Sequence, residues 1–179
     1  MKKKIKIIST NKKGFTLIEV LIYVSIFVIL IVSITVFVIT FTETIAKIKI
    51  KREISLAAYS AINTIIYEIK RANNIYIPAS SFNNHPGQLS LETSQELPPD
   101  EKITYIDFYL DNNNRIYIRK ENQSPQMLIS ENFRVTNLKF EYLGSSGESV
   151  RIDLSLEYDS PSPKYQYSYS LSSSASIRK

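Results

Sequence analysis

The chain of 179 residues contains no cysteine, one histidine and four glycines. Without cysteine it can form no disulfide, ligate no iron–sulfur cluster and use no thiol nucleophile. With His85 as the only histidine, a two-histidine metal site and the metalloprotease motif are excluded, and a Ser-His-Asp triad would need His85 as its base. The chain has neither a Gly-x-Ser-x-Gly elbow nor a glycine-rich phosphate loop. We therefore expect no catalytic residue, no metal site and no cofactor.

Basic residues are concentrated before Gly14. The lysines in this leader are Lys2, Lys3, Lys4, Lys6, Lys12 and Lys13. The whole chain has a formal charge of +5, and removal of these six lysines from its 22 basic residues leaves 16 against 17 acidic ones, a net charge of −1. The remainder lacks the positive balance of a nucleic-acid-binding domain, so we expect no nucleic-acid partner.

Proline and glycine are absent between Phe15 and Ile77, and the first part of this stretch is strongly apolar. Val20 to Phe41 contains no charged residue, and as a helix it would span roughly 33 Å, enough for a hydrocarbon core of about 30 Å. The lysine excess before the run predicts a cytoplasmic N-terminus and an exported remainder. A short basic cluster from Lys47 to Arg52 follows, which we interpret as a solvated helix face at the bilayer surface.

Glu19 is the single charge at the start of the apolar run. A glutamate near a helix end can stay hydrated among lipid headgroups, but a carboxylate in a membrane helix usually has a partner. If the chain were cut after Gly14, the new amine of Phe15 would stand four residues from Glu19 and provide a compensating cation. A neighbouring chain could provide the same amine.

The residues Gly14-Phe15-Thr16-Leu17-Ile18-Glu19-Val20-Leu21, behind a basic leader that includes Lys12 and Lys13, resemble the processing motif of type IV pilins and pseudopilins. The resemblance implies that a membrane-embedded prepilin peptidase cleaves between Gly14 and Phe15 and methylates the Phe15 amine. It also implies that Glu19 pairs with the terminal amine of an adjacent subunit. Implied partners are other pilin or pseudopilin subunits, an inner-membrane assembly platform and membrane lipid. Many pilins have a helix-bending proline where this chain has Val36.

The expected fold is α+β, with a long N-terminal membrane-spanning and stalk helix packed on an antiparallel β-sheet head. We assign residues 1–14 to a leader, 15–41 to the transmembrane half of the helix, 42–74 to its amphipathic stalk and 75–179 to the β-rich head. We place the end of the helix near Asn73 and Asn74. Spacings of three and four predict one helix face that packs on the head. Its members are Ile54, Ala58, Ala61, Ile65, Ile69 and Ala72. The opposite, polar face includes Arg52, Glu53, Asn63, Tyr67, Glu68, Lys70 and Arg71.

After Pro78 the pattern changes to short alternating segments that predict antiparallel strands and a sheet over the apolar face of the helix. Predicted strands are 88–92, 103–110, 115–120, 127–129, 133–143, 150–158 and 165–171. The Asp-Asn-Asn-Asn sequence at 111–114 predicts a tight hairpin turn, and residues 144–147 predict another. This strand order resembles the J-type minor pseudopilin of type II secretion, while competence pseudopilins and minor pilins of retractile pili stay open.

The head has few candidates for ligand binding. Asp107, Asp111 and Glu121 carry oxygens that calcium accepts, but their spacing matches no defined loop and favours ordinary surface carboxylates. Most of the head tyrosines fall at alternating strand positions, which favours cross-strand packing over a carbohydrate or protein contact surface. The leading hypothesis is a non-enzymatic minor pilin or pseudopilin in a periplasmic or cell-surface filament. The alternative is an uncleaved, single-pass signal-anchor protein with a ligand-binding or sensory head.

Overall fold

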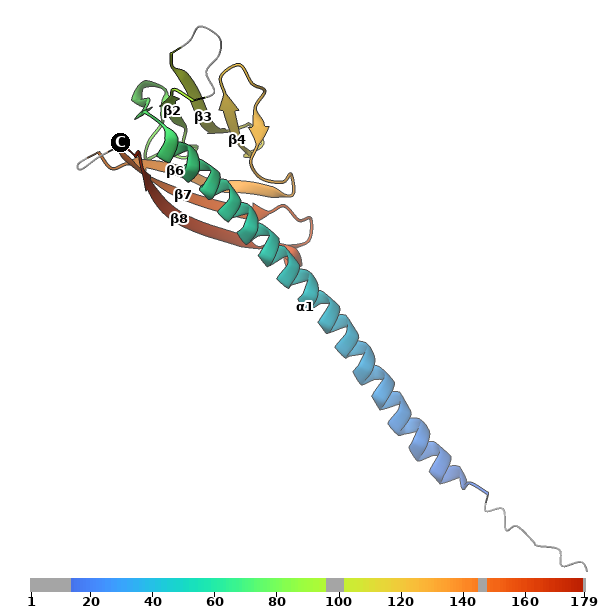
Figure 1. The fold of residues 1–179 in the computed structure, drawn as a ribbon. Coiled ribbons are helices and arrows are strands. Elements are labelled where there is room, and N and C mark those ends of the chain that lie inside the picture. The colour runs from blue at the N-terminus through green and yellow to red at the C-terminus, as the bar shows by residue number, and fades with distance from the viewer. Residues whose placement is uncertain (1–13, 96–101, 145–147, 179) are drawn as a thin grey trace, which may run out of the picture. The chain divides into compact units, whose positions relative to one another are not determined.

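A computed structural model describes residues 14–95, 102–144 and 148–178. The leader lysines Lys12 and Lys13 lie outside the described residues. By its internal contacts the chain divides into a unit that ends at Ile45 and a unit that begins at Ala46. Long helix α1 (Leu17–Arg71) belongs to both units, and every strand belongs to the second (Figure 1).

Helix α1 begins and ends two residues inside the predicted limits of Phe15 and Asn73. Thr16 precedes the first turn, where its Oγ1 accepts a long hydrogen bond of 3.4 Å from the Glu19 N–H and its carbonyl accepts the Val20 N–H. The helix stops before Asn73 because the Asn73 N–H bonds to the Glu92 carbonyl at 2.8 Å. Between these ends α1 continues through Val36 without a break.

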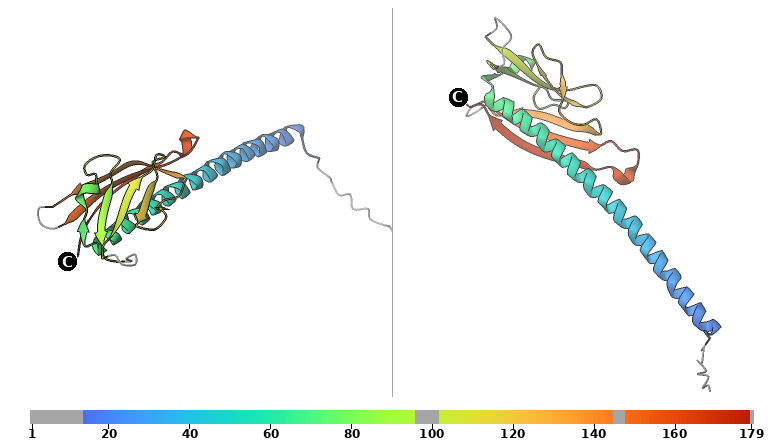
Figure 2. Two further views of the ribbon diagram at one scale, coloured as in Figure 1. Left: turned by 90° about the horizontal axis from the view of Figure 1, so that it is seen from above. Right: turned by 45° about the vertical axis from the view of Figure 1, so that its right-hand side comes forward.

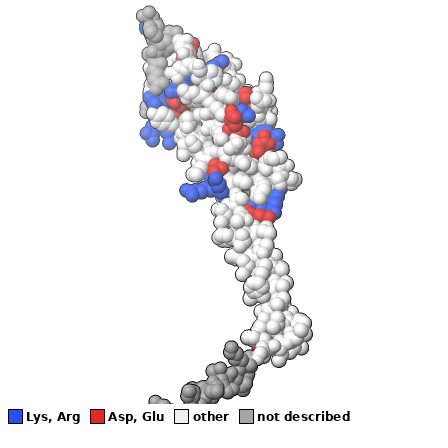
Figure 3. All heavy atoms as spheres, turned by 90° about the vertical axis from the view of Figure 1, so that its right-hand side faces the viewer, with Lys and Arg blue, Asp and Glu red and all other residues white. Residues whose placement is uncertain are grey.

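The hydroxyl groups in the apolar run are satisfied within the helix. Ser25, Ser33, Thr35 and Thr40 each donate to the carbonyl four residues earlier, at 2.8 to 2.9 Å. Each of these hydroxyl groups, which would be costly to leave unpaired in hydrocarbon, therefore has a backbone carbonyl as its acceptor. By length and composition, α1 could cross a membrane. In Figure 3 the apolar run is almost entirely white, and charged side chains gather over the second unit.

The helix face predicted to pack on the head lies in the core. Ile54, Ala58, Ala61, Ile65 and Ile69 are all fully buried, in one cluster with side chains from both sheets of the head. Figures 1 and 2 show the last turns of α1, in green, alongside β6 (Phe133–Tyr142), β7 (Ser149–Tyr158) and β8 (Ser168–Ser176).

Glu68 was assigned to the polar face, and this prediction is wrong. Its side chain is 9% exposed, and Oε1 lies 3.4 Å from the Nζ of Lys120. The periodicity of α1 cannot show this contact because Lys120 comes from strand β4, more than fifty residues later. The ion pair offsets the cost of burying the Glu68 carboxylate.

The strands described are antiparallel, as predicted, and they form two sheets. The first has the order β1-β2-β3-β4-β5, with β1 Asn74–Ile75, β2 Leu89–Thr93, β3 Thr104–Leu110, β4 Ile116–Lys120 and β5 Gln126–Met127. The second has the order β6-β7-β8, with β6 Phe133–Tyr142, β7 Ser149–Tyr158 and β8 Ser168–Ser176. Short 3-10 helices are η1 (Ile77–Ala79) and η2 (Pro163–Tyr165).

The predicted hairpin at 111–114 is confirmed. Strands β3 and β4 pair from Leu110↔Ile116 to Ile106↔Lys120. Asp111 Oδ1 accepts the N–H groups of Asn113 and Arg115, and Asn114 takes a positive φ of 57°. The second predicted turn lies mostly outside the described residues, which omit 145–147.

The last strand was predicted at 165–171, and both limits are wrong. Tyr165 belongs to η2, whose first residue is Pro163, and β8 continues to Ser176. The segment from Ser172 to Ser176 lacks the apolar alternation that would predict a strand. It is a strand because β8 pairs along β7, from Ser149↔Ser176 to Glu157↔Ser168.

The loop from Ser81 to Gln88 covers one edge of β6. The N–H groups of Asn83 and Gly87 donate to the carbonyls of Phe140 and Leu138, and His85 Nδ1 accepts the Leu138 N–H at 3.1 Å. The lone histidine thus helps to attach the loop to the sheet. Its side chain is exposed.

Candidate processing and docking site

Gly14, Phe15 and Thr16 precede the first residue of α1 and are exposed. A Cβ placed on Gly14 would meet no atom within 4 Å, and Phe15 is 74% exposed. The Gly14–Phe15 peptide bond therefore lies in accessible chain outside the regular helix. A protease needs such a bond because helical hydrogen bonding and packing would hinder its entry into an active site.

Phe15, Glu19 and Tyr23 form one stripe along the start of α1. The Tyr23 hydroxyl donates to Glu19 Oε1 at 3.2 Å, and the rings of Phe15 and Tyr23 meet edge to face with centroids 6.4 Å apart. Sequence reasoning missed Tyr23, although its spacing of four residues from Glu19 is the signal for such a contact. The stripe brings an aromatic ring, a carboxylate and a phenol together on one side of an otherwise apolar helix.

The charge of Glu19 is left to be compensated from outside the described chain. Glu19 lies in the first turn, where the helix dipole favours a negative charge. Among the described residues, none with a basic side chain forms an ion pair with it. A free amine at Phe15, on this chain or a neighbouring one, has the charge that this site lacks.

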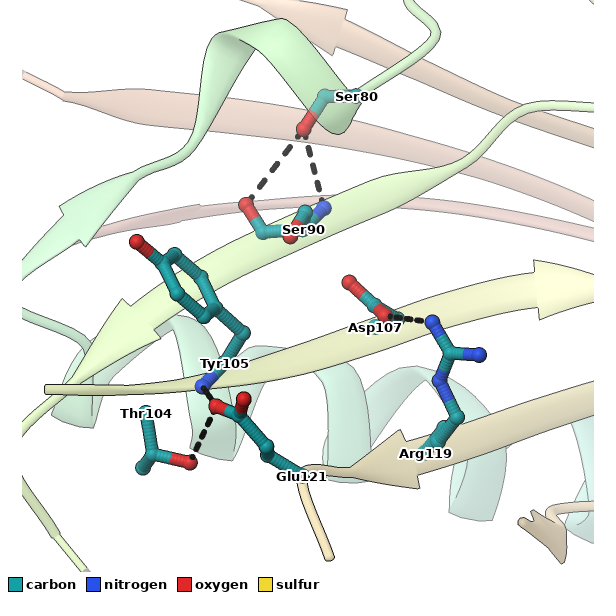
Figure 4. Close-up of polar contacts among 7 residues, drawn as sticks. All are labelled: Ser80, Ser90, Thr104, Tyr105, Asp107, Arg119 and Glu121. Carbon is teal, nitrogen blue, oxygen red and sulfur yellow. Dashed lines mark hydrogen bonds and ion pairs between the residues drawn. The ribbon is translucent and has the colours of Figure 1, made fainter. Parts of the chain in front are cut away.

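The head has a polar cluster on its five-stranded sheet (Figure 4). Arg119 donates to Asp107 Oδ2 at 2.6 Å across the β3–β4 pair, and its guanidinium lies 5.8 Å from the Tyr109 ring centroid. This hydrogen bond and the Asp107 charge raise the pKa of Arg119. Burial, followed by the negative charge of Glu92, raises the pKa of Tyr105. Both shifts preserve the charge states of these groups at neutral pH.

The carboxylates considered as calcium ligands are engaged by protein donors. Glu121 Oε2 accepts the Thr104 hydroxyl and the Tyr105 N–H, both at 3.2 Å, while Asp111 accepts the N–H groups of its own turn (Figure 4 shows Glu121). Within the described ranges, no three His, Asp or Glu side chains are grouped so as to hold a metal ion. In the same view, Ser80 Oγ accepts the Ser90 N–H at 3.0 Å and joins η1 to β2.

Comparison with protein families gives one match, to the prokaryotic N-terminal methylation motif, over residues 9–39. Gly14, Phe15, Glu19 and Tyr23 all lie within it. No curated protein and no solved structure matches the chain. The matched motif includes the first part of α1, and the antiparallel head follows this helix, as in a pilin fold. This match supports a precursor protein of the type IV pilin and pseudopilin kind.

Proposed function

We propose that this protein is a minor pilin or pseudopilin, a non-enzymatic subunit that is cleaved after Gly14, methylated on Phe15 and assembled into a filament. The observation that carries the proposal is the exposed Gly14–Phe15 bond directly before an apolar helix with one carboxylate in its first turn. The proposed filament is of the type II secretion or type IV pilus-like kind, and the strand order predicted from the sequence resembles that of the J-type minor pseudopilin.

Filament assembly follows from the energetics of α1. Before assembly, lipid covers the large apolar side chains of the run, which are 47% to 84% exposed in the isolated chain. A carboxylate costs on the order of 2.5 to 3.5 kcal/mol at the centre of a membrane helix and less near its end. Pairing with a neighbour's amine would remove part of this cost, so Glu19 favours docking over storage of the free subunit.

The proposed function places the protein in the inner membrane and then in a filament. The N-terminus stays in the cytoplasm, α1 spans the inner membrane once, and the head is exported before the subunit enters a filament in the periplasm or on the cell surface. The partners are prepilin peptidase, sibling subunits, the inner-membrane assembly platform and membrane lipid.

Co-expression with a prepilin peptidase and mass spectrometry of the N-terminus test the proposal. We expect a mature chain that begins at Phe15 and carries one methyl group on its amine. A Gly14→Val variant is the matched control, since a branched side chain at an otherwise uncrowded position blocks close approach of the protease and should leave the leader attached. An intact leader on the unaltered chain would favour the signal-anchor alternative and overturn the proposal.

A further inference from the structure

The second unit contains a groove between the first turns of its part of α1 and the chain around η2, which we call the interfacial groove. Its volume is about 330 Å³. Its lining includes Lys47, Ile48 and Lys51 from α1 and Lys164, Tyr165 and Tyr167 from the η2 segment. Residues more than a hundred positions apart in the chain thus share one surface.

The interfacial groove combines apolar walls with ammonium groups. Ile48, Tyr165 and Tyr167 provide apolar and aromatic surface, and Lys51 Nζ lies 5.7 Å from the Tyr167 ring centroid. This position over a ring face is favourable for a cation and holds the ammonium beside the groove. The neighbouring Lys49 pairs with Glu53 on the helix surface at 3.9 Å, so Lys47 and Lys51 are the α1 lysines that face the groove.

The chain keeps the interfacial groove close to the apolar run. Lys47 follows Phe41, the last residue of that run, by six positions. Six residues span about 9 Å in a helix and about 20 Å even when fully extended. Headgroup layers add roughly 5 to 8 Å to each side of the hydrocarbon core. Where the apolar run crosses a bilayer, lysine and tyrosine side chains of this groove can therefore reach the headgroups.

We propose that the interfacial groove binds the phosphodiester headgroup of an anionic phospholipid, an inference that rests on the membrane insertion in the proposed function. Lys47, Lys51 and Lys164 surround the phosphate, and Tyr165 and Tyr167 lie beside it at the level of the headgroups. Tyrosine is enriched at this depth, and lysine stems lie along apolar surface while their ammonium groups reach the phosphates. Basic clusters beside a membrane span bind anionic lipid.

The test uses the full chain in vesicles of phosphatidylcholine alone and of phosphatidylcholine with phosphatidylglycerol. Because the chain has no cysteine, single cysteines can carry a nitroxide label at chosen positions. Gln166→Cys reports on the interfacial groove, Asn112→Cys on the β3–β4 turn and Ser33→Cys on the apolar run. We expect phosphatidylglycerol to lower the accessibility of the label at 166 to a water-soluble nickel complex several-fold, with little change at 112.

A triple variant with Lys47→Gln, Lys51→Gln and Lys164→Gln should abolish the response to phosphatidylglycerol. The matched control replaces Lys70, Lys102 and Arg178 by glutamine, which removes the same charge from elsewhere and should retain the response. Equal accessibility in both vesicles, or an unchanged response in the triple variant, would overturn the inference. Protection of residue 166 by inorganic phosphate in phosphatidylcholine vesicles would assign the groove to free phosphate and overturn the lipid assignment.

The label at Ser33→Cys separates this inference from the proposed function. The label at 33 can be exposed to oxygen dissolved in the bilayer while the accessibility of the label at 166 does not change with phosphatidylglycerol. In that case only the proposed lipid site is wrong. If the label at 33 is in water, membrane insertion has failed and both proposals fall.

Discussion

Glu19 has one hydrogen-bond donor of its own, the Tyr23 hydroxyl, and its charge is otherwise uncompensated among the described residues. We expect Glu19→Ala to be cleaved and methylated normally but to enter filaments at least about tenfold less, since an ion pair of about 1.4 kcal/mol changes an equilibrium tenfold. Quantitative immunoblots of sheared filaments and whole membranes measure the ratio. Tyr23→Phe keeps the carboxylate and serves as the control. Normal incorporation of Glu19→Ala would contradict the docking role.

Asp153 predicts an acid-dependent contribution to the stability of the head. Burial acts to raise its pKa, but hydrogen bonds from Ser172 at 2.6 Å and Arg151 at 3.1 Å outweigh burial and lower the pKa below 3.8. A carboxylate with a depressed folded-state pKa stabilises the fold above its unfolded-state pKa and loses this effect as pH falls through the folded value.

For the full chain in detergent, we therefore expect Asp153→Asn to lower the melting temperature at pH 7. The difference from the unaltered chain should stay constant down to about pH 4, near the ordinary carboxyl pKa, and shrink below it. Circular dichroism melts across this pH range measure the difference. A gap that widens as the pH falls would show that the sign of the shift is wrong.

Helix α1 is attached to the head by its buried face, and Ile65 lies on this face with no exposed surface. Ile65→Ala should lower the free energy of unfolding by about 2 to 5 kcal/mol because it removes buried methyl groups and leaves a cavity. Urea unfolding followed by tyrosine fluorescence measures this change. Leu56→Ala, at a position that is 57% exposed on the same helix, should change stability little. Equal losses in the two variants would refute the assignment of the packing face.

The loop from Ser81 to Gln88 requires Gly87 for its close approach to β6. A Cβ at this position would lie 2.9 Å from the Leu138 carbonyl oxygen and 3.1 Å from the Phe140 ring. Gly87→Ala should therefore cost about 1 to 3 kcal/mol of stability, as overpacking does in other cores. Gly14→Ala meets no neighbouring atom and should leave the unfolding curve unchanged. The same urea titration compares them, and an unaffected Gly87→Ala would show that the loop can move away from β6.

At the scale of elements, prediction from the sequence succeeded where local pattern decides structure. The β3–β4 hairpin follows from alternating residues around Asp111 to Asn114, whose side chains and backbone form the turn themselves. It failed for β1, which has two residues, and for the serine-rich end of β8. Both segments depend on hydrogen bonds to distant strands, β2 and β7, which a local pattern does not contain.

The asymmetry of charge along the whole molecule predicts its orientation in the membrane. Lysines precede the apolar run, and short leaders rich in lysine are retained on the cytoplasmic side. In a host without prepilin peptidase, which leaves the leader attached, we expect a cysteine at position 112 to react with a membrane-impermeant thiol reagent in right-side-out vesicles. We expect one at position 9 to react only after permeabilisation. Replacing all six leader lysines by glutamine should reduce labelling at 112. Labelling of position 9 from outside would contradict the assigned orientation.

Sequence alone determined the methylation motif and the apolar run, because each depends on neighbouring residues, and its charge asymmetry predicts an orientation in the membrane. It also identified the face of α1 from Ile54 to Ile69, since helical periodicity places those residues on one side. Only the tertiary structure decided that the head has two sheets, that Glu68 is buried beside Lys120, and that Lys51 lies over Tyr167. These features join segments distant in the chain, and their pairing is decided by packing of the whole core.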